Sequence, residues 1–84
     1  MEAWVDRLAA ELGEEPLTDA EATRLLRAAR DVAHRVERKI TPLAAFLLGS
    51  AAGRRVAGGA SREEALAVTL EALELLLPTA PPEG

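Results

Sequence analysis

The single histidine of the chain, His34, lies in a charged segment that has the spacing of one helix face. On a straight helix this face is a stripe at positions i, i+4, i+7 and i+11, which comprises Arg27, Asp31, His34 and Arg38. One interpretation is a solvated face with weak ion pairs, such as Asp31 with Arg27 and with Arg35. The other is a binding stripe, in which arginine forks hold an anion or an acidic partner and His34 is a titratable contact. The spacing of these residues is compatible with both interpretations.

Neither a metal site nor a phosphate-binding loop is predicted. Asp31 and Glu37 flank His34 at i−3 and i+3, but they lie about 120° apart on a helix and leave the histidine without a paired ligand. The segment GSAAGRR, residues 49–55, lacks the lysine and the glycine spacing of a P-loop, and no strand precedes it. No cofactor is therefore expected. The candidate binding residues are Arg27, Asp31, His34, Glu37, Arg38 and Arg54.

Groups that could catalyse a reaction are scarce. The chain has no cysteine and no tyrosine, and its two serines are Ser50 and Ser61. Ser61 occupies the position of a helix cap, and Ser50 lies in the middle of a predicted helix, far in sequence from a base that could activate it. We therefore predict that the protein is not an enzyme.

The charge is unevenly distributed along the chain. Residues 24–62 carry nine basic and two acidic side chains, residues 1–23 carry one basic and seven acidic ones, and residues 63–84 carry five acidic ones. The basic segment, residues 24–62, either interacts with the acidic ends of the same chain or binds an acidic partner. The net charge of −4 and the aromatic content of 2% disfavour nucleic-acid binding. No segment has the length and apolarity of a membrane span or a signal peptide, so a soluble, cytoplasmic protein is expected.

Helical periodicity predicts an all-α fold. We expect one domain, a small four-helix bundle over residues 1–78, followed by a flexible, proline-rich tail, residues 79–84. The helices are expected over residues 2–12, 18–40, 41–57 and 61–77.

Local signals mark where these helices begin and end. Thr18 and Ser61 have a glutamate three residues later, which predicts two capping boxes. Gly13 is expected to end the first helix. Thr41 is expected to cap the third, with Pro42 at its first position, so that the second and third helices are separate.

The third helix is predicted to be the buried centre of the bundle. Residues 43–52 carry no charge, and a helix that is apolar all round is typical of a buried one. Small residues recur at every fourth position and form a ridge that lets another helix approach closely: Ala45, Gly49, Gly53 and Ala57.

The fourth helix has more apolar surface than one contact requires. One stripe consists of Leu66, Leu70, Leu73 and Leu77. Val68 and Leu75 lie nearly opposite this stripe. The extra surface predicts a protein partner or a homodimer through this helix. The alternative is that the fourth helix lies between the first and the third.

The segment ARDVAHRVERKITPLAAFLLGSAAGR, residues 29–54, resembles the core motif of a small bacterial family of uncharacterised helical domains. That motif has approximately the form DVAH-x-x-ER, then P-L, then F-L-x-G-x-A-x-G-R, and Trp4 also fits the family. The matching positions are Asp31, His34, Glu37, Arg38, Pro42, Leu43, Phe46, Gly49, Gly53 and Arg54. Lys39 and Ile40 depart from the small residues or proline expected before the P-L pair.

The family's members are short stand-alone proteins or a C-terminal part of the molybdenum-cofactor guanylyltransferase. The resemblance therefore implies a non-enzymatic accessory or protein-interaction module near molybdopterin–guanine dinucleotide biosynthesis. The implied partner is the guanylyltransferase or a molybdoenzyme. Two alternatives stay open: a protein that binds a phosphate- or pterin-type anion between Arg38 and Arg54, and a homo-oligomeric structural domain.

Overall fold

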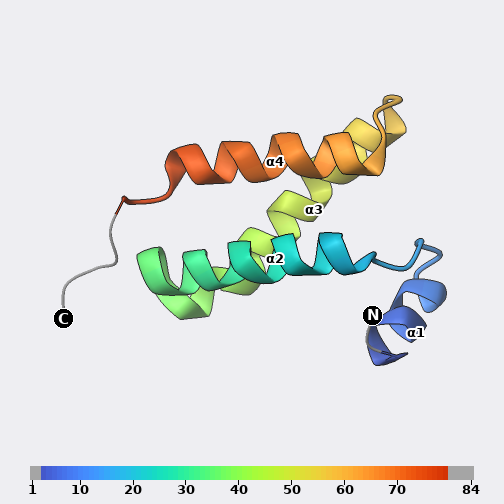
Figure 1. Cartoon of the computed structure of the whole chain (residues 1–84), viewed down its shortest axis with the longest axis horizontal. Helices are drawn as coiled ribbons and strands as arrows, with labels where there is room; N and C mark the ends of the chain where they lie inside the picture. The colour runs from blue at the N-terminus through green and yellow to red at the C-terminus, as the bar shows by residue number, and fades with distance from the viewer. Residues whose placement is uncertain (1–2, 80–84) are drawn as a thin grey trace.

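The computed structural model describes residues 3–79 of the 84, and every regular element among them is helical (Figure 1). The elements are α1 (Ala3–Glu11), α2 (Asp19–Val32), the π-helical turn η1 (Ala33–Glu37), the 3₁₀ turn η2 (Arg38–Ile40), α3 (Thr41–Ala57) and α4 (Arg62–Leu76). The predicted all-α class is confirmed. Of the predicted tail, only Thr79 lies within the described residues.

The prediction of a four-helix bundle is wrong, because three helices pack on one another and α1 lies apart from them. α3 contacts both α2 and α4, while α1 lies beyond the start of α2 and makes only marginal contacts (Figure 1). The radius of gyration is 13.5 Å, against about 12 Å for a compact domain of this length. The arrangement is therefore open, and α4 does not lie between α1 and α3.

The predicted helix starts at Thr18 and Ser61 are confirmed. The Thr18 hydroxyl accepts the Glu21 N–H at 3.1 Å, and the Glu21 carboxylate accepts the Thr18 N–H at 2.9 Å, which completes a capping box. The Ser61 hydroxyl accepts the Glu64 N–H at 3.1 Å, but it also donates to the Glu64 carboxylate at 3.0 Å. The predicted second capping box is therefore incomplete, because the Glu64 carboxylate accepts from the Ser61 hydroxyl and not from the Ser61 backbone N–H.

Two glycines with positive φ end α1 and α3. Gly13 has φ 72° and Gly59 has φ 111°, a region in which a side chain is strained. Beside Gly13, the Glu14 N–H donates to the Ala9 carbonyl at 2.8 Å, which is the long bond of a Schellman motif. This motif confirms the predicted end of α1 and sets the direction in which the chain leaves it.

The junction between α2 and α3 differs from the prediction. The break lies at Glu37, whose backbone is extended with φ −164° and ψ 135°. Thr41 is helical, with φ −53° and ψ −47°, although it precedes Pro42. No side chain caps α3, and the buried Thr41 hydroxyl has no hydrogen-bond partner. The chain therefore changes direction in the π-helical and 3₁₀ turns, and not at a threonine cap as the sequence predicted.

The core is small and comes mainly from α2 and α4. Its buried residues are Ala22, Val32, Ala65, Leu66, Thr69 and Leu77. The predicted inward stripe of α4 is confirmed, since Leu66 and Leu77 are buried and Leu70 and Leu73 are half-buried. The Thr69 hydroxyl donates to the Ala65 carbonyl at 3.0 Å, so its burial leaves no donor unpaired.

α3 is central in its contacts but not buried, which corrects the sequence prediction. None of its residues is buried, and Leu43, Phe46 and Leu47 are 64%, 74% and 68% exposed. α2 and α4 cover only one side of α3, and α1 does not cover the other. Uncharged side chains therefore face solvent along most of its length.

Between residues 3 and 79, no helix has both the length and the apolarity needed to cross a bilayer.

Candidate functional site

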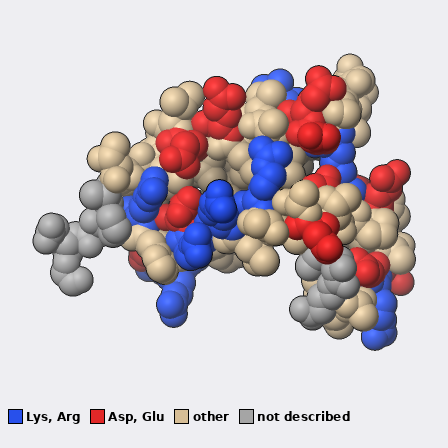
Figure 2. All heavy atoms as spheres, viewed as in Figure 1, with Lys and Arg blue, Asp and Glu red and all other residues tan. Residues whose placement is uncertain are grey.

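Basic side chains gather over α2 and the turn into α3, with acidic side chains above them on α4 (Figure 2). Of the residues predicted to form a binding stripe, Arg27, His34 and Arg38 are exposed and Asp31 is half-buried. His34 thus lies off the core, as its spacing predicted. The exposed basic side chains of this surface, called here the α2 basic face, are Arg24, Arg27, Arg30, Arg38 and Lys39.

The structure does not preserve the straight stripe through His34. Arg27 and Asp31 lie on α2, but His34 lies in the π-helical turn, whose wider turn changes the angle between successive side chains. Arg38 follows the extended Glu37 and belongs to a different element. The four residues therefore do not share one helix face.

The ion pairs expected of Asp31 do not form. Arg35 instead pairs with Glu74 of α4 at 3.6 Å, and Glu37 pairs with Lys39 at 3.5 Å. The first of these pairs ties the η1 turn to α4 and supports the packing of the three helices. It also removes Arg35 from any anion site on the α2 basic face.

Arg38 and Arg54 are not brought together. Arg38 precedes α3, and Arg54 lies in its last turn. Thr41 and Arg54 are thirteen positions apart on α3, a rise of about 20 Å along the helix axis at 1.5 Å per residue. The backbones of Arg38 and Arg54 are therefore well separated along α3.

A groove with a volume of about 1100 Å³ lies between α2 and α3. It is called here the α2–α3 groove. Its floor is apolar and includes Leu25, Val32, Leu48 and Leu66.

One wall of the α2–α3 groove is the predicted ridge of small residues, Ala45, Gly49, Gly53 and Ala57. A Cβ atom added at Gly49 or Gly53 would meet nothing within 4 Å. The small residues of the ridge line the groove, and the space beside Gly49 and Gly53 is open.

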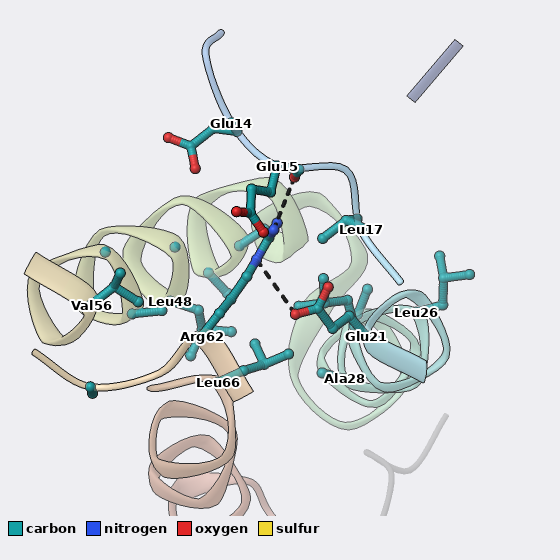
Figure 3. A pocket seen from close by; sticks show the side chains of 18 of the residues that line it. Glu14, Glu15, Leu17, Glu21, Leu26, Ala28, Leu48, Val56, Arg62 and Leu66 are labelled. Carbon is teal, nitrogen blue, oxygen red and sulfur yellow. Dashed lines mark hydrogen bonds and ion pairs between the residues drawn. The ribbon is translucent and has the colours of Figure 1, made fainter. Parts of the chain in front are cut away.

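Arg62 closes one end of the α2–α3 groove (Figure 3). Its guanidinium donates to the Glu15 carbonyl at 2.9 Å and to the Pro16 carbonyl at 3.4 Å, and its Nε lies 3.5 Å from the Glu21 carboxylate. One side chain therefore joins the starts of α4 and α2 and the connection before α2. Sequence reasoning missed this role, because Glu15 lies 47 residues away and no local pattern connects the two.

The second groove lies between α3 and α4, has a volume of about 590 Å³, and is called here the α3–α4 groove. Its lining includes the apolar side chains of Leu47, Val68 and Leu76, which are 68%, 42% and 84% exposed. Arg54 and Arg55 are its charged residues. Neither guanidinium makes an ion pair or a hydrogen bond within residues 3–79. Val68 belongs to the extra apolar surface predicted for the fourth helix, whereas Leu75 lies outside the groove.

The described residues provide two grooves and the α2 basic face as candidate surfaces. In the described part of the chain, no group of three histidine, cysteine, aspartate or glutamate side chains is placed to hold a metal ion. The Ser61 hydroxyl is engaged by Glu64, and both grooves are lined mostly by apolar and small residues. Of the predicted binding residues, Arg54 lines a groove, while the others lie on or beside the α2 basic face.

Comparison with known proteins gives one match. No curated protein and no solved structure has significant similarity to the chain. A family model matches residues 1–83, nearly the full length. The chain belongs to this family, which is described as a domain of unknown function (DUF6457).

Proposed function

We propose that the protein is a non-enzymatic helical module that binds another protein in the α3–α4 groove. One observation carries this proposal: an open apolar groove contains two arginines that have no partner within the described residues. Exposed apolar side chains gathered in a groove are typical of a protein-binding surface. Unpaired arginines on such a groove select a partner that supplies carboxylates.

The chemistry of the groove favours an amphipathic helix as the bound segment. Helix-binding grooves take up apolar side chains at helical spacing and leave the polar face of the bound helix at the rim. Leu47, Val68 and Leu76 would contact its apolar face. Arg54 and Arg55 would pair with acidic side chains on its flank, because the planar guanidinium matches a carboxylate in a two-bond geometry.

The resemblance of residues 29–54 to the family motif described above supports a particular class of partner protein. It implies a guanylyltransferase of molybdenum-cofactor biosynthesis, or a molybdoenzyme, as the protein that carries the bound segment. Arg54, at the end of the matching motif, lies in the proposed groove. The alternative of a small anion held between Arg38 and Arg54 is less favoured, because Arg38 precedes α3 and Arg54 lies in its last turn.

Neutral substitution of the groove arginines tests the proposal. In calorimetric titrations of the full chain with purified guanylyltransferase, R54Q/R55Q is expected to raise the Kd about tenfold or more. The reason is that hydrogen bonds between charged groups contribute about 1.5–3 kcal/mol each, and about 1.4 kcal/mol corresponds to a factor of ten.

The matched control is R27Q/R30Q, which removes the same charge from the α2 basic face. It is expected to leave the Kd within about threefold, because those side chains lie outside the groove. Equal losses in both variants would show a nonspecific charge effect, and no binding by the unaltered chain would contradict the proposed partner.

A further inference from the structure

One of the helices that border the α3–α4 groove has the composition of the segment that this groove is suited to bind. Val68, Ala72 and Leu76 of α4 are exposed, recur at every fourth position and line the groove. Glu71 is also exposed and lies three positions after Val68, which makes the two side chains neighbours on the helix surface. α4 therefore presents an apolar stripe with an acidic residue on its flank.

The unpaired charges of this surface lie at different levels along α4. Arg54 and Arg55 are in the last turn of α3, and the chain reverses over a short connection before α4 begins at Arg62 (Figure 1). The groove is therefore basic toward the start of α4. Glu71 follows Arg62 by nine positions, a rise of about 13 Å at 1.5 Å per residue. Within residues 3–79, Arg54, Arg55 and Glu71 make no ion pair or hydrogen bond through their side chains.

We propose that a second copy of the chain covers the α3–α4 groove, with α4 of each copy lying against the groove of the other. A two-fold axis across α4 runs the two helices in opposite directions, so the basic end of one surface meets the acidic end of the other. Arg54 and Arg55 of each copy then pair with Glu71 of the other copy, and this contact forms twice. The charges that one chain leaves unpaired are thus complementary between two chains.

The size of the surface suits a weak, reversible dimer. The apolar stripe from Val68 to Leu76 spans about 12 Å of helix at 1.5 Å per residue. An interface built from two such stripes and Leu47 of both copies belongs to the small class, which buries less than about 1,200 Å² in total and is typical of transient association. The homodimer predicted through the fourth helix thereby has a specific surface.

Reversal of charge on either side of the contact tests the dimer without any other protein. Sedimentation of the full chain is expected to show a dimer at about 100 μM that dissociates on dilution. E71R places like charges opposite one another in both contacts, and so does R54E/R55E. Each variant is expected to raise the dissociation constant of the dimer about tenfold or more.

An equimolar mixture of E71R and R54E/R55E gives the sharpest result. In the mixed dimer, Arg54 and Arg55 of the first variant face the unaltered Glu71 of the second. The introduced glutamates of the second face the introduced arginine of the first. The mixture is therefore expected to regain the association that each variant alone has lost.

Two controls reverse the same charges on other surfaces. E14R and R27E/R30E change exposed side chains outside the α3–α4 groove, and both are expected to remain dimers. Because the side chains changed in E71R and R54E/R55E are exposed as well, circular dichroism is expected to show the helix content of the unaltered chain in all variants. A strictly monomeric unaltered chain at 100 μM, a dimer that persists in E71R, or a mixture that fails to associate would overturn the proposal.

The dimer covers the groove that is proposed to bind a partner, and only the resulting competition rests on the proposed function. E71R keeps both groove arginines, so it is expected to bind the guanylyltransferase more tightly than the unaltered chain does at concentrations where the unaltered chain is dimeric. A dimer that forms while no transferase binds would contradict the proposed function and support this inference. Transferase binding by an unaltered chain that stays monomeric would support the proposed function and overturn the dimer.

Discussion

Replacement of Leu66 by alanine is expected to lower the free energy of unfolding by about 2–3 kcal/mol. Leu66 is 9% exposed and lies near the start of α4, where it forms part of the floor between α2 and α3. Its removal leaves a cavity that surrounding side chains fill only in part. Because a domain this small is stabilised by only a few kcal/mol, the variant is expected to be partly unfolded at room temperature. Urea unfolding followed by far-UV circular dichroism measures the change.

Leu75 is the matched control for Leu66. It lies on the same helix and is 82% exposed, so L75A is expected to change the free energy of unfolding by less than about 0.5 kcal/mol. The comparison holds residue type and helix constant and varies only burial. Similar losses in L66A and L75A would contradict the assignment of the core to the inward face of α4.

Replacement of Arg62 by alanine is expected to lower the free energy of unfolding by about 1–2 kcal/mol. The substitution removes the hydrogen bond to the Glu15 carbonyl and the ion pair with Glu21, whose side chain is only 13% exposed. The magnitude lies toward the low end for charged hydrogen bonds, because 36% of the Arg62 side chain faces solvent. The same urea experiment measures it.

R62K tests whether the shape of the guanidinium matters. The Nη1 and Nε atoms reach a carbonyl and a carboxylate on different segments, and a lysine ammonium provides only one point of charge. R62K is therefore expected to recover less than half of the stability lost in R62A. Full recovery by lysine would show that Arg62 acts only through its charge.

The helix ends were predictable because their signals are local. Thr18 and its capping glutamate lie within one turn, and the φ of Gly13 follows from the tight turn that ends α1. The junction at residues 33–41 was not predictable in the same way. The preference against helical backbone before Pro42 is weak enough for packing to override it, and the break falls at Glu37 instead.

The candidate sites depend on tertiary structure, which explains what the sequence missed. The uncharged run of α3 correctly indicated an apolar surface, but burial was predicted from that lack of charge alone, and the burial depends on which helices cover α3. The sequence could identify Arg54 as a candidate residue. It could not identify the α4 residues that line the α3–α4 groove with Arg54, because they are brought near it only by the packing of α4 on α3. The contact of Arg62 with Glu15 spans 47 residues, beyond the reach of any helical spacing.

The most direct test of a partner-binding α3–α4 groove is the ¹H–¹⁵N spectrum of the full chain during titration with the guanylyltransferase. We expect the resonances of groove residues to shift or broaden first, in particular those of Leu47, Arg54, Val68 and Leu76. Resonances of the α2 basic face, such as that of Arg27, are expected to change little. Perturbation confined to the α2 basic face, or none at saturating transferase, would contradict the account.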